Sequence, residues 1–314
     1  MLLLYQGEAF NANFFHESKL DIDHAFLLAD GTRKTLLVSL MNAAYARSRF
    51  KGRVRVYKDA IKDLSALVKG RTAGFDASSM SFRMASRIRK SCRLKDVSQE
   101  LLAARAKKTP AEASLVSRAV RETKEIFESL DWKSARTEQD IHRQLLLMTF
   151  ERGLEPAFPP IVSSGTGTSF PHYTAQKKKL GPLVLVDYGV RYGHYCADLT
   201  RCFIRDNDRK KKEQYERLQD ICVFIADALP GLDTGKDVAK LAGELVAKAG
   251  FPKMPHAIGH GVGLDIHEFP RLGPKSDDAL AGATIAIEPS FYLKNYGMRF
   301  EETVWFDGKR ARIL

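Results

Sequence analysis

The chain has 314 residues, of which 44% are hydrophobic and 28% charged, and this composition is typical of a folded globular protein. Its length predicts two domains, or one large α/β domain with an appendage. No stretch approaches the roughly 18 apolar residues of a membrane-spanning helix, and the opening "MLLLY" is too short for the apolar core of a secretory signal. The four cysteines lack a paired metal-ligand spacing and are interpreted as thiols of a reducing compartment. We therefore expect a cytoplasmic protein without a membrane partner.

The formal net charge of +12 raises the hypothesis of nucleic-acid binding. However, the basic clusters "RIRKSCRLK", "QKKKL" and "DRKKKEQYER" are not interleaved with exposed aromatic residues and follow no nucleic-acid-binding motif. We interpret them as solvated surface that attracts anionic partners weakly, and we expect no nucleic-acid partner. Whether the basic surface has any partner stays open at this point.

The residues before about Arg105 alternate short strands with helices. The segments "HAFLLA" and "KTLLVSL" predict two strands around the turn "DGTRK", and "DAIKDLSALVKG" predicts an amphipathic helix that ends at Gly70. A further strand-then-helix pair follows. This order predicts an N-terminal α/β domain over residues 1–105, and the region holds no cluster of catalytic residue types.

The rest of the chain, residues 106–314, begins with helices and ends with strands. Thr109, Pro110 and Glu112 have the spacing of a capping box with proline at the first helical position, and Thr137 caps the next predicted helix. Two more amphipathic segments follow, and "ATIAIEPSFYL" and "MRFEETVWF" then predict strands. This arrangement predicts an α+β layer architecture for a second domain.

Two aspartates stand out in the stretch "GPLVLVDYGVRYGHYCADLTRCF", which predicts a buried strand, a turn and a second strand. Asp187 and Asp198 lie among its apolar residues, where a carboxylate costs several kcal/mol unless a charge compensates it. Antiparallel pairing would bring the two together, and a divalent cation would turn their repulsion into binding. The alternative is that they are solvated at strand ends, or paired with Arg191 or Arg201.

Further ligand-type residues follow in "PHAIGHGVGLDIHEFPR", which holds three of the eight histidines of the chain. Glu288 then ends the apolar strand of "IAIEP", and Glu301 lies in "MRFEE". Four carboxylates and a histidine on strands or beside glycine-rich turns predict a dinuclear metal centre. Oxygen-rich ligation with a single imidazole suits Mn, Co, Fe or Zn better than a thiolate site would.

With these motifs the sequence resembles the pita-bread metallopeptidases, the family of methionine aminopeptidase, aminopeptidase P, prolidase and creatinase. The resemblance runs from about Lys107 to the C-terminus and rests on "VDYG", "ADLTR", "GHGVGLDIHE", "IEP" and "RFEE". The preceding domain resembles the N-terminal domain of the creatinase/prolidase type. The resemblance implies two divalent metal ions bound by Asp187, Asp198, His260, Glu288 and Glu301.

The same resemblance implies roles for further residues around the metals. His172 in "FPHY" matches a substrate-side histidine, and His267 in "DIHE" matches the histidine that stabilises the tetrahedral intermediate. Glu288 is expected to move the proton of the attacking water. His256 and Arg299 match positions found in the proline-directed members, and Arg271 in "HEFPR" matches the arginine with which prolidases hold the terminal carboxylate of a substrate.

Three stretches depart from the family pattern. "EPS" replaces the usual "EPG", "AGATIAIEP" stands where the family commonly has Pro-Gly, and "SSGTGTSF" lacks an asparagine often found there. All three concern loops rather than ligands, so they bear on the subclass more than on the chemistry.

The function expected from the resemblance is dinuclear-metal-dependent hydrolysis of Xaa-Pro peptide bonds in short proline-containing peptides, by an Xaa-Pro dipeptidase (prolidase). The enzyme alternative is an Xaa-Pro aminopeptidase acting on longer peptides. The alternative from another class is a non-catalytic pita-bread binding protein, which the complete ligand set argues against. The sequence leaves open the physiological metal, the residue preferred before proline, and whether the chain forms a homodimer.

Overall fold

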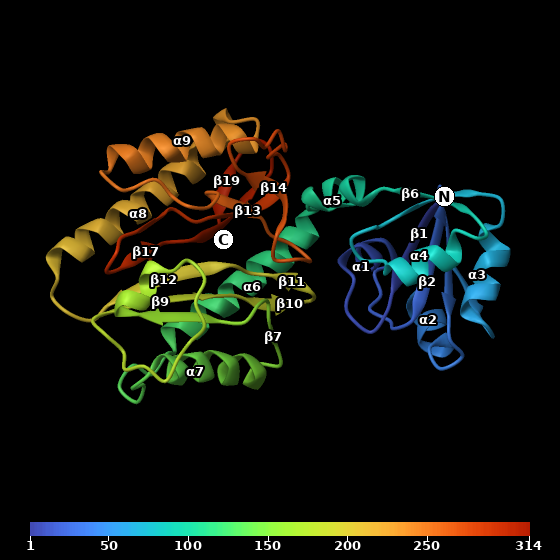
Figure 1. Ribbon diagram of the computed structural model, residues 1–314, viewed down its shortest axis with the longest axis horizontal. Coiled ribbons are helices and arrows are strands. Elements are labelled where there is room, and N and C mark those ends of the chain that lie inside the picture. Colours follow the sequence, from blue (N-terminus) through green and yellow to red (C-terminus); the bar gives the residue numbers. More distant parts are fainter. The chain divides into compact units, whose positions relative to one another are not determined.

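The computed structural model describes residues 1–314 and divides them into two compact units, Met1–Arg105 (unit 1) and Ala106–Leu314 (unit 2) (Figure 1). Both units combine helices with sheets that are mostly antiparallel or mixed, so the predicted α+β class is confirmed. No helix is both long enough and apolar enough to cross a lipid bilayer.

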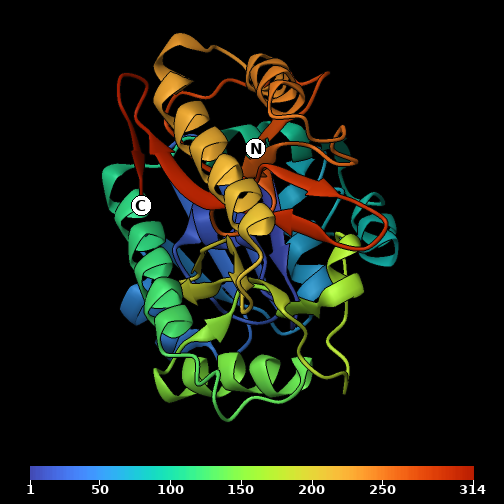
Figure 2. The same ribbon diagram turned by 90° about the vertical axis from the view of Figure 1, so that its left-hand side faces the viewer.

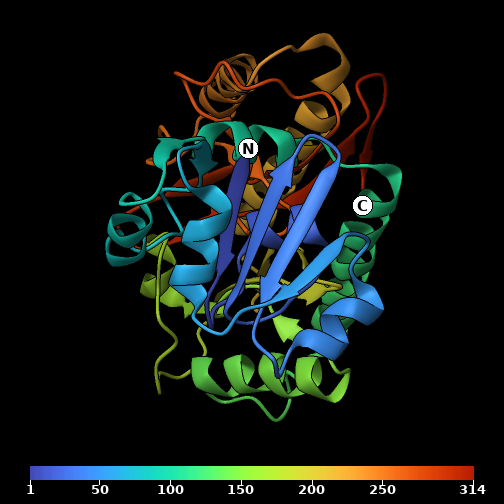
Figure 3. The same cartoon turned by 90° about the vertical axis from the view of Figure 1, so that its right-hand side faces the viewer.

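Unit 1 is built on a six-stranded sheet of order β4-β3-β2-β1-β5-β6, whose strands lie side by side in Figure 3. Antiparallel pairing joins β1, β2 and β3, whereas the outer pairs β3–β4 and β5–β6 are parallel. The strands are β1 (Leu2–Gln6), β2 (Ala25–Asp30), β3 (Arg33–Val38), β4 (Arg53–Val56), β5 (Thr72–Phe75) and β6 (Arg93–Asp96). The helices are α1 (Ala12–Ser18), α2 (Ala43–Arg49), α3 (Ala60–Val68), α4 (Phe82–Ile88) and α5 (Ser98–Ala106).

The sheet of unit 1 has an apolar core on each face, as strand periodicity predicts. Phe26 and Leu28 of β2 belong to one buried cluster, whereas Leu27 between them belongs to the other. Successive side chains of a strand point to opposite faces, so a run of apolar residues indicates a strand that is covered on both sides.

The helices of unit 2 begin where the sequence predicts. The capping boxes of Thr109 with Glu112 and of Thr137 with Asp140 are both formed, and Pro110 takes the first position of its helix. Unit 2 has four long helices, which Figure 2 shows around its strands. They are α6 (Pro110–Glu128), α7 (Glu138–Glu151), α8 (Arg209–Ala228) and α9 (Gly235–Lys248).

The strands of unit 2 form four small sheets, of orders β11-β10-β7, β12-β9-β8, β14-β13-β15-β18-β19 and β16-β17. Three of them, all but β11-β10-β7, share an apolar core with α8 and α9. The first strands are β7 (Glu155–Pro156), β8 (Ile161–Ser164), β9 (Leu183–Tyr188), β10 (Val190–Tyr192), β11 (Tyr195–Cys196) and β12 (Leu199–Ile204). The others are β13 (Gly259–Gly261), β14 (Glu268–Leu272), β15 (Ala283–Ile287), β16 (Ser290–Tyr292), β17 (Gly297–Arg299), β18 (Glu302–Phe306) and β19 (Ala311–Ile313).

The stretch that carries the two aspartates differs in two respects from the prediction of a strand, a turn and a second strand, and the first is that β10 lies within the predicted turn. β9 and β12 pair antiparallel with Asp187 opposite Thr200, but the second predicted strand is divided into β11 and β12. Asp198 lies in the break between them. At this break the chain passes close to Gly189, where an added Cβ would lie 1.8 Å from the carbonyl oxygen of Ala197. Only glycine allows this approach.

The segments that carry Asp198 and Glu301 meet edge to edge. The backbone N–H of Glu301 donates to the carbonyl of Thr200 at 3.2 Å, and the Thr303 hydroxyl donates to the carbonyl of Asp198 at 2.9 Å. β13 pairs with β15 and places His260 opposite Ala286 in the neighbouring sheet. The sheet contacts therefore gather residues more than a hundred positions apart in the sequence.

Candidate metal centre

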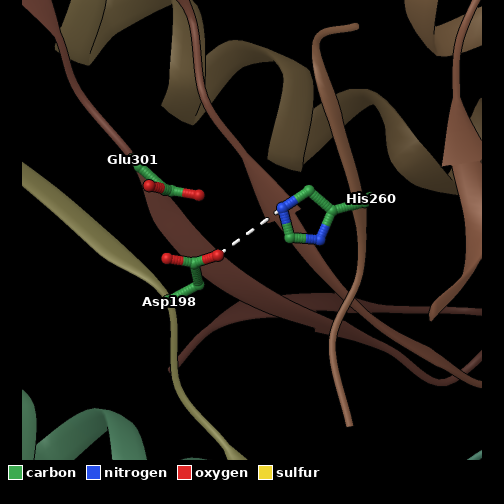
Figure 4. Close-up of side chains that lie close together, drawn as sticks. All are labelled: Asp198, His260 and Glu301. Atoms are coloured by element: carbon green, nitrogen blue, oxygen red, sulfur yellow. Dashed lines mark ion pairs between the residues drawn. The ribbon is translucent and has the colours of Figure 1, made fainter. Parts of the chain in front are cut away.

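Asp198, His260 and Glu301 form a compact cluster of ligand-type side chains in unit 2 (Figure 4). One ligand atom from each lies within 4.8 Å of the others, and Nε2 of His260 is 3.5 Å from Oδ2 of Asp198. Both carboxylates are buried, with 5% of Asp198 and 2% of Glu301 exposed. This arrangement is suited to a cation, because buried carboxylates this close together repel one another without one.

The glycines on either side of His260 explain its position and orientation. A Cβ at Gly259 would lie 1.9 Å from the carbonyl oxygen of Ala286, and one at Gly261 would lie 2.1 Å from that of Phe269. The GHG sequence therefore lets β13 fit closely between its neighbours. Nδ1 of His260 lies 3.0 Å from the carbonyl oxygen of Gly261, and this contact holds the ring with Nε2 toward Asp198.

Arg299 lies between the other two predicted ligands, Asp187 and Glu288. Its Nη2 donates to Oδ2 of Asp187 at 2.5 Å, and its Nε is 4.0 Å from Oε2 of Glu288. The guanidinium is buried, with 4% of the residue exposed. It therefore compensates part of the negative charge, and it joins Asp187 and Glu288 to the cluster of Asp198, His260 and Glu301.

The pKa values of these groups show that burial and mutual repulsion disfavour their charged forms. Burial, followed by repulsion from Glu301 and Asp187, raises the pKa of Asp198 well above its usual range. Burial and repulsion from Glu288 do the same to the pKa of Glu301. Burial raises the pKa of Glu288 to about 7, and burial lowers the pKa of His260 to about 4. The protein alone therefore favours neutral forms at this site.

The donor set fits a divalent metal ion by three observations. It offers several buried carboxylates with only one guanidinium among them, and it offers a neutral imidazole whose Nε2 faces Asp198. The third is Oδ1 of Asp187, which is buried and has no hydrogen-bond partner. A cation would favour the charged carboxylates, and oxygen ligands with one imidazole suit borderline and hard metals.

His256 lies beside Glu288 and is held by two hydroxyl groups. Its Nδ1 is 3.8 Å from Oε2 of Glu288, and its Nε2 is 2.9 Å from Oγ of Ser290 and 3.2 Å from the hydroxyl of Tyr292. Ser290 is the residue by which "EPS" departs from the family pattern. Its hydroxyl therefore contacts a site residue, which a glycine could not do.

His172 and His267 lie on loops near Asp187. His172 is exposed in the segment after the short helix η1 (Gly165–Ser169), and the ring of His267 lies 4.3 Å from that of His260 between centroids, nearly perpendicular to it. Both histidines act on the pKa of Asp187. Burial has the largest effect and raises this pKa, whereas Arg299 and the charges of the two histidines lower it. Their exposure leaves them accessible to a substrate.

The loop that carries His267 is held by a buried ion pair. Nζ of Lys108 is 2.9 Å from Oε2 of Glu268, and only 3% and 1% of these side chains are exposed. Oε1 of Glu268 accepts from the backbone N–H of Asp265 at 3.1 Å. There is no room for a side chain at Gly263, since its Cβ would lie 2.3 Å from Glu268. This pair fixes the residue next to His267.

Arg271 lies apart from the carboxylates and forms a surface ion pair. Its Nε is 3.4 Å from Oδ2 of Asp278, its side chain is 65% exposed, and its guanidinium lies over the ring of Phe269. The sequence left two interpretations open, a contact with substrate or a pair with Asp277 or Asp278. The structure contains the pair with Asp278, while Asp277 pairs with Lys236.

Two residues that the sequence did not single out complete the network. The Thr200 hydroxyl accepts from Nε of Arg299 at 2.9 Å and donates to Oε2 of Glu301 at 2.6 Å. The Tyr292 hydroxyl accepts from Nη1 of Arg299 at 3.0 Å. Thr200 follows Asp198 by two residues, so strand periodicity could have placed it on the same side. Tyr292 had no comparable signal.

Comparisons with known proteins agree with this site. Residues 86–307 match the model of metallopeptidase family M24. The chain is 29% identical over 304 residues to the Xaa-Pro dipeptidase of Pyrococcus furiosus, an alignment that covers 92% of this chain and 86% of that protein. It is similar in structure to the prolidase of Pyrococcus furiosus, with a TM-score of 0.89 at 25% identity over 99% of this chain and 95% of that one.

The X-Pro aminopeptidase of Thermotoga maritima has the same fold, with a TM-score of 0.87 at 22% identity over 100% of this chain and 95% of that one. The expected pita-bread architecture with a preceding N-terminal domain is confirmed by these matches. The family model spans the segments that carry Asp198, His260 and Glu301. The chain belongs to metallopeptidase family M24.

Proposed function

We propose that this metallopeptidase is an Xaa-Pro dipeptidase that hydrolyses the bond before proline in short peptides. The observation that carries the proposal is the buried cluster of Asp198, His260 and Glu301, joined through Arg299 to Asp187 and Glu288. It lies in a member of family M24, and relatives named Xaa-Pro dipeptidase or prolidase align with nearly the whole chain.

The residues that would hold two divalent ions are Asp187, Asp198, His260, Glu288 and Glu301. Their oxygen-rich character suits Mn²⁺ or Co²⁺, with Zn²⁺ and Fe²⁺ as alternatives. When bound, such ions polarise the scissile carbonyl and lower the pKa of a water toward neutrality. Arg299, hydrogen-bonded to Asp187 and to two hydroxyl groups, would hold the ligands in place.

Proton transfer is assigned to Glu288. Burial raises the pKa of Glu288 to about 7 when no cation is bound, so its surroundings stabilise the protonated form. A carboxylate of this kind can accept the proton of the attacking water and give it to the leaving nitrogen of proline. His256 lies 3.8 Å from it and would hold the same side of the substrate.

Stabilisation of the oxyanion is assigned to His267 and His172. Both rings are exposed and lie near Asp187, and neither belongs to the buried cluster. A donor aimed at the charge that develops in the transition state contributes to turnover more than to binding. The Lys108–Glu268 ion pair would keep His267 in that position.

Arg271 is the proposed anchor for the free carboxylate of a dipeptide. Its present partner, Asp278, holds it in an exposed pair, and exposed pairs contribute about 1 kcal/mol or less, so a substrate carboxylate can replace it. The same observation supports the second candidate, an Xaa-Pro aminopeptidase, because Arg271 paired with Asp278 would leave the end of the substrate open. The two candidates differ in the need for a free carboxylate.

A peptide panel separates the candidates. The metal-loaded protein is given Met-Pro, its C-terminal amide and a Met-Pro-Xaa tripeptide, each with Mn²⁺, Co²⁺ and Zn²⁺. The dipeptidase assignment predicts rapid hydrolysis of Met-Pro and slow hydrolysis of the other two. Faster cleavage of the tripeptide would favour the aminopeptidase, and no cleavage of any peptide would favour a binding protein.

Two finer assignments are part of the proposal. A cytoplasmic location is supported by the four cysteines, all of which are buried free thiols, as expected in a reducing compartment. A homodimer stays a prediction, and light scattering of the purified chain tests it.

A further inference from the structure

The positive charge of the protein is concentrated in unit 1. Residues 1–105 contain 19 basic and 10 acidic side chains, a net charge of +9, whereas residues 106–314 contain 31 and 28, a net charge of +3. Unit 1 is therefore three times as positive as unit 2, with half its length. None of the metal-site residues lies in unit 1, so this charge has no part in the proposed catalysis.

Within unit 1, all charged residues of one stretch are basic. Residues 31–58 include eight basic side chains and no aspartate or glutamate. Five of the eight alternate with other residues in "RSRFKGRVR" and do not form a contiguous run, which makes them inconspicuous in the sequence. The eight are Arg33, Lys34, Arg47, Arg49, Lys51, Arg53, Arg55 and Lys58.

The sheet of unit 1 collects several of these cations in one groove. Thr35 of β3 pairs with Arg53 of β4 and with Leu28 of β2, so alternate residues of the three strands line one face. The groove at this face has a volume of about 490 Å³. Its six basic lining residues are Arg33, Lys34, Lys51, Arg53, Arg55 and Arg71, and its one acidic lining residue is Asp30.

Only two of the six cations form an ion pair, and a third, Arg33, lies opposite Asp30 in the pairing of β2 with β3. Arg71 pairs with Asp30 at 2.5 Å, and Lys34 pairs with Glu17 at 2.9 Å. The other four, Arg33, Lys51, Arg53 and Arg55, form no ion pair. Like charges that share a groove raise its positive potential and attract an anion that can contact several of them at once.

We propose that this groove binds the phosphate backbone of single-stranded nucleic acid without sequence preference. Four of the six cations are arginines, whose planar guanidinium matches phosphate oxygens in a bidentate manner. The four cations without an ion pair lie on β3, on β4 and just before β4, so an extended polyanion can contact several of them at once, whereas a small phosphate contacts fewer. The groove has no aromatic, asparagine or glutamine lining to read bases.

The test is the binding of a fluorescently labelled single-stranded RNA of mixed sequence to the full chain, followed by anisotropy over a range of salt concentrations. Each phosphate contact contributes about −0.7 to the slope of log K against log salt for a single strand. The double variant Arg33→Gln/Arg53→Gln should weaken binding at low salt about tenfold or more. It should also make the slope shallower by about 1.4, because two contacts are lost.

The matched control is Arg83→Gln/Arg87→Gln, which removes the same charge from exposed arginines of α4. It should leave RNA affinity within about twofold and the slope nearly unchanged. Met-Pro hydrolysis and the unfolding temperature of both double variants should match those of the parent. These readouts exclude misfolding and make the result independent of the proposed function.

Three outcomes would overturn the proposal. Equal losses in the two double variants would show that the charge of unit 1 acts diffusely. Absence of RNA binding at low salt would exclude the ligand class. Binding of inorganic triphosphate, or of vesicles containing an anionic phospholipid, more tightly than of RNA would assign the groove to a different phosphate ligand.

Discussion

The two units use charge in opposite ways. Unit 1 carries a net +9 on exposed side chains and buries few ionised groups, whereas unit 2 is nearly neutral and buries a group of carboxylates around one guanidinium. An exposed charge stays hydrated and contributes little to stability, so unit 1 folds around its two apolar cores whatever it binds. A buried charge must be compensated.

The comparison shows that a bound ligand can be inferred where charged groups are buried at a cost in free energy. The carboxylates of unit 2 have raised pKa values because burial and mutual repulsion disfavour their charged forms, and this cost requires a compensating ligand. The cations of unit 1 have no such cost, and their grouping is visible only in the sheet register. Buried charge in unit 2 should therefore respond strongly to mutation, and exposed charge weakly.

The largest expected effect is at the centre of the buried cluster. Asp198→Asn should lower Met-Pro turnover by roughly 10³-fold or more, because metal activation supplies several kcal/mol of transition-state stabilisation. It should also reduce the bound metal from two ions to one. Metal content by mass spectrometry and steady-state kinetics check both, with circular dichroism as the control for folding. Normal turnover with two bound ions would remove Asp198 from the ligand set.

The ion pair beneath His267 should act through that residue. His267→Ala should lower turnover about 10²–10³-fold with little change in KM. Lys108→Met should lower it about ten- to a hundredfold, because a small displacement of a catalytic group is enough. Lys108→Arg, which keeps the charge, is the matched control. In a His267→Ala background, Lys108→Met should cost nothing further, and a full additional loss would mean that Lys108 acts elsewhere.

Sequence patterns predicted the ligand-type residues because a carboxylate in an apolar strand is anomalous wherever it lies. They could not predict that Arg299 would bridge Asp187 and Glu288, since that contact depends on how β17 meets β9 and β12. They also left the environment of Arg271 undecided. The unit 1 groove was missed for the same reason, because Arg33 and Arg53 come to line one groove only through the pairing of β3 with β4.

Arg271, an exposed charge of unit 2, should affect the binding of the substrate but not the stability of the fold. Arg271→Ala should raise KM for Met-Pro at least tenfold, since a charge-assisted contact to a carboxylate contributes about 1.5–3 kcal/mol. It should hardly change hydrolysis of Met-Pro amide, and the unfolding temperature should stay constant. Equal losses of activity on both substrates, or no loss on either, would favour the Xaa-Pro aminopeptidase over the dipeptidase.

The smallest effect is expected at Glu17 of unit 1. A hydrogen bond with His16 and a contact with Lys34 lower the pKa of Glu17 to about 2, despite partial burial. Because the folded pKa lies below the unfolded value, the stabilisation is present above about pH 4.5 and is lost as pH falls toward 2. Glu17→Gln should cost about 1 kcal/mol at pH 7 and progressively less between pH 5 and pH 3. Denaturant unfolding at several pH values measures it, and a constant difference would contradict the assignment.

The central claim is that divalent cations compensate the buried carboxylates of unit 2. The most direct measurement is the free energy of unfolding of metal-stripped protein at pH 5.5 and pH 8, with and without Mn²⁺. Burial raises the pKa of Glu288 to about 7 and the pKa values of Asp198 and Glu301 well above their usual range, so between pH 5.5 and pH 8 these carboxyl groups bind more protons in the folded state than in the unfolded state. The pKa of His260, lowered by burial to about 4, acts in the opposite direction below about pH 6.5 and offsets part of this effect. Without metal, stability should therefore fall by a few kcal/mol between pH 5.5 and pH 8, and Mn²⁺ should restore it at pH 8. Equal stability of the stripped protein at both pH values, unchanged by Mn²⁺, would contradict the account.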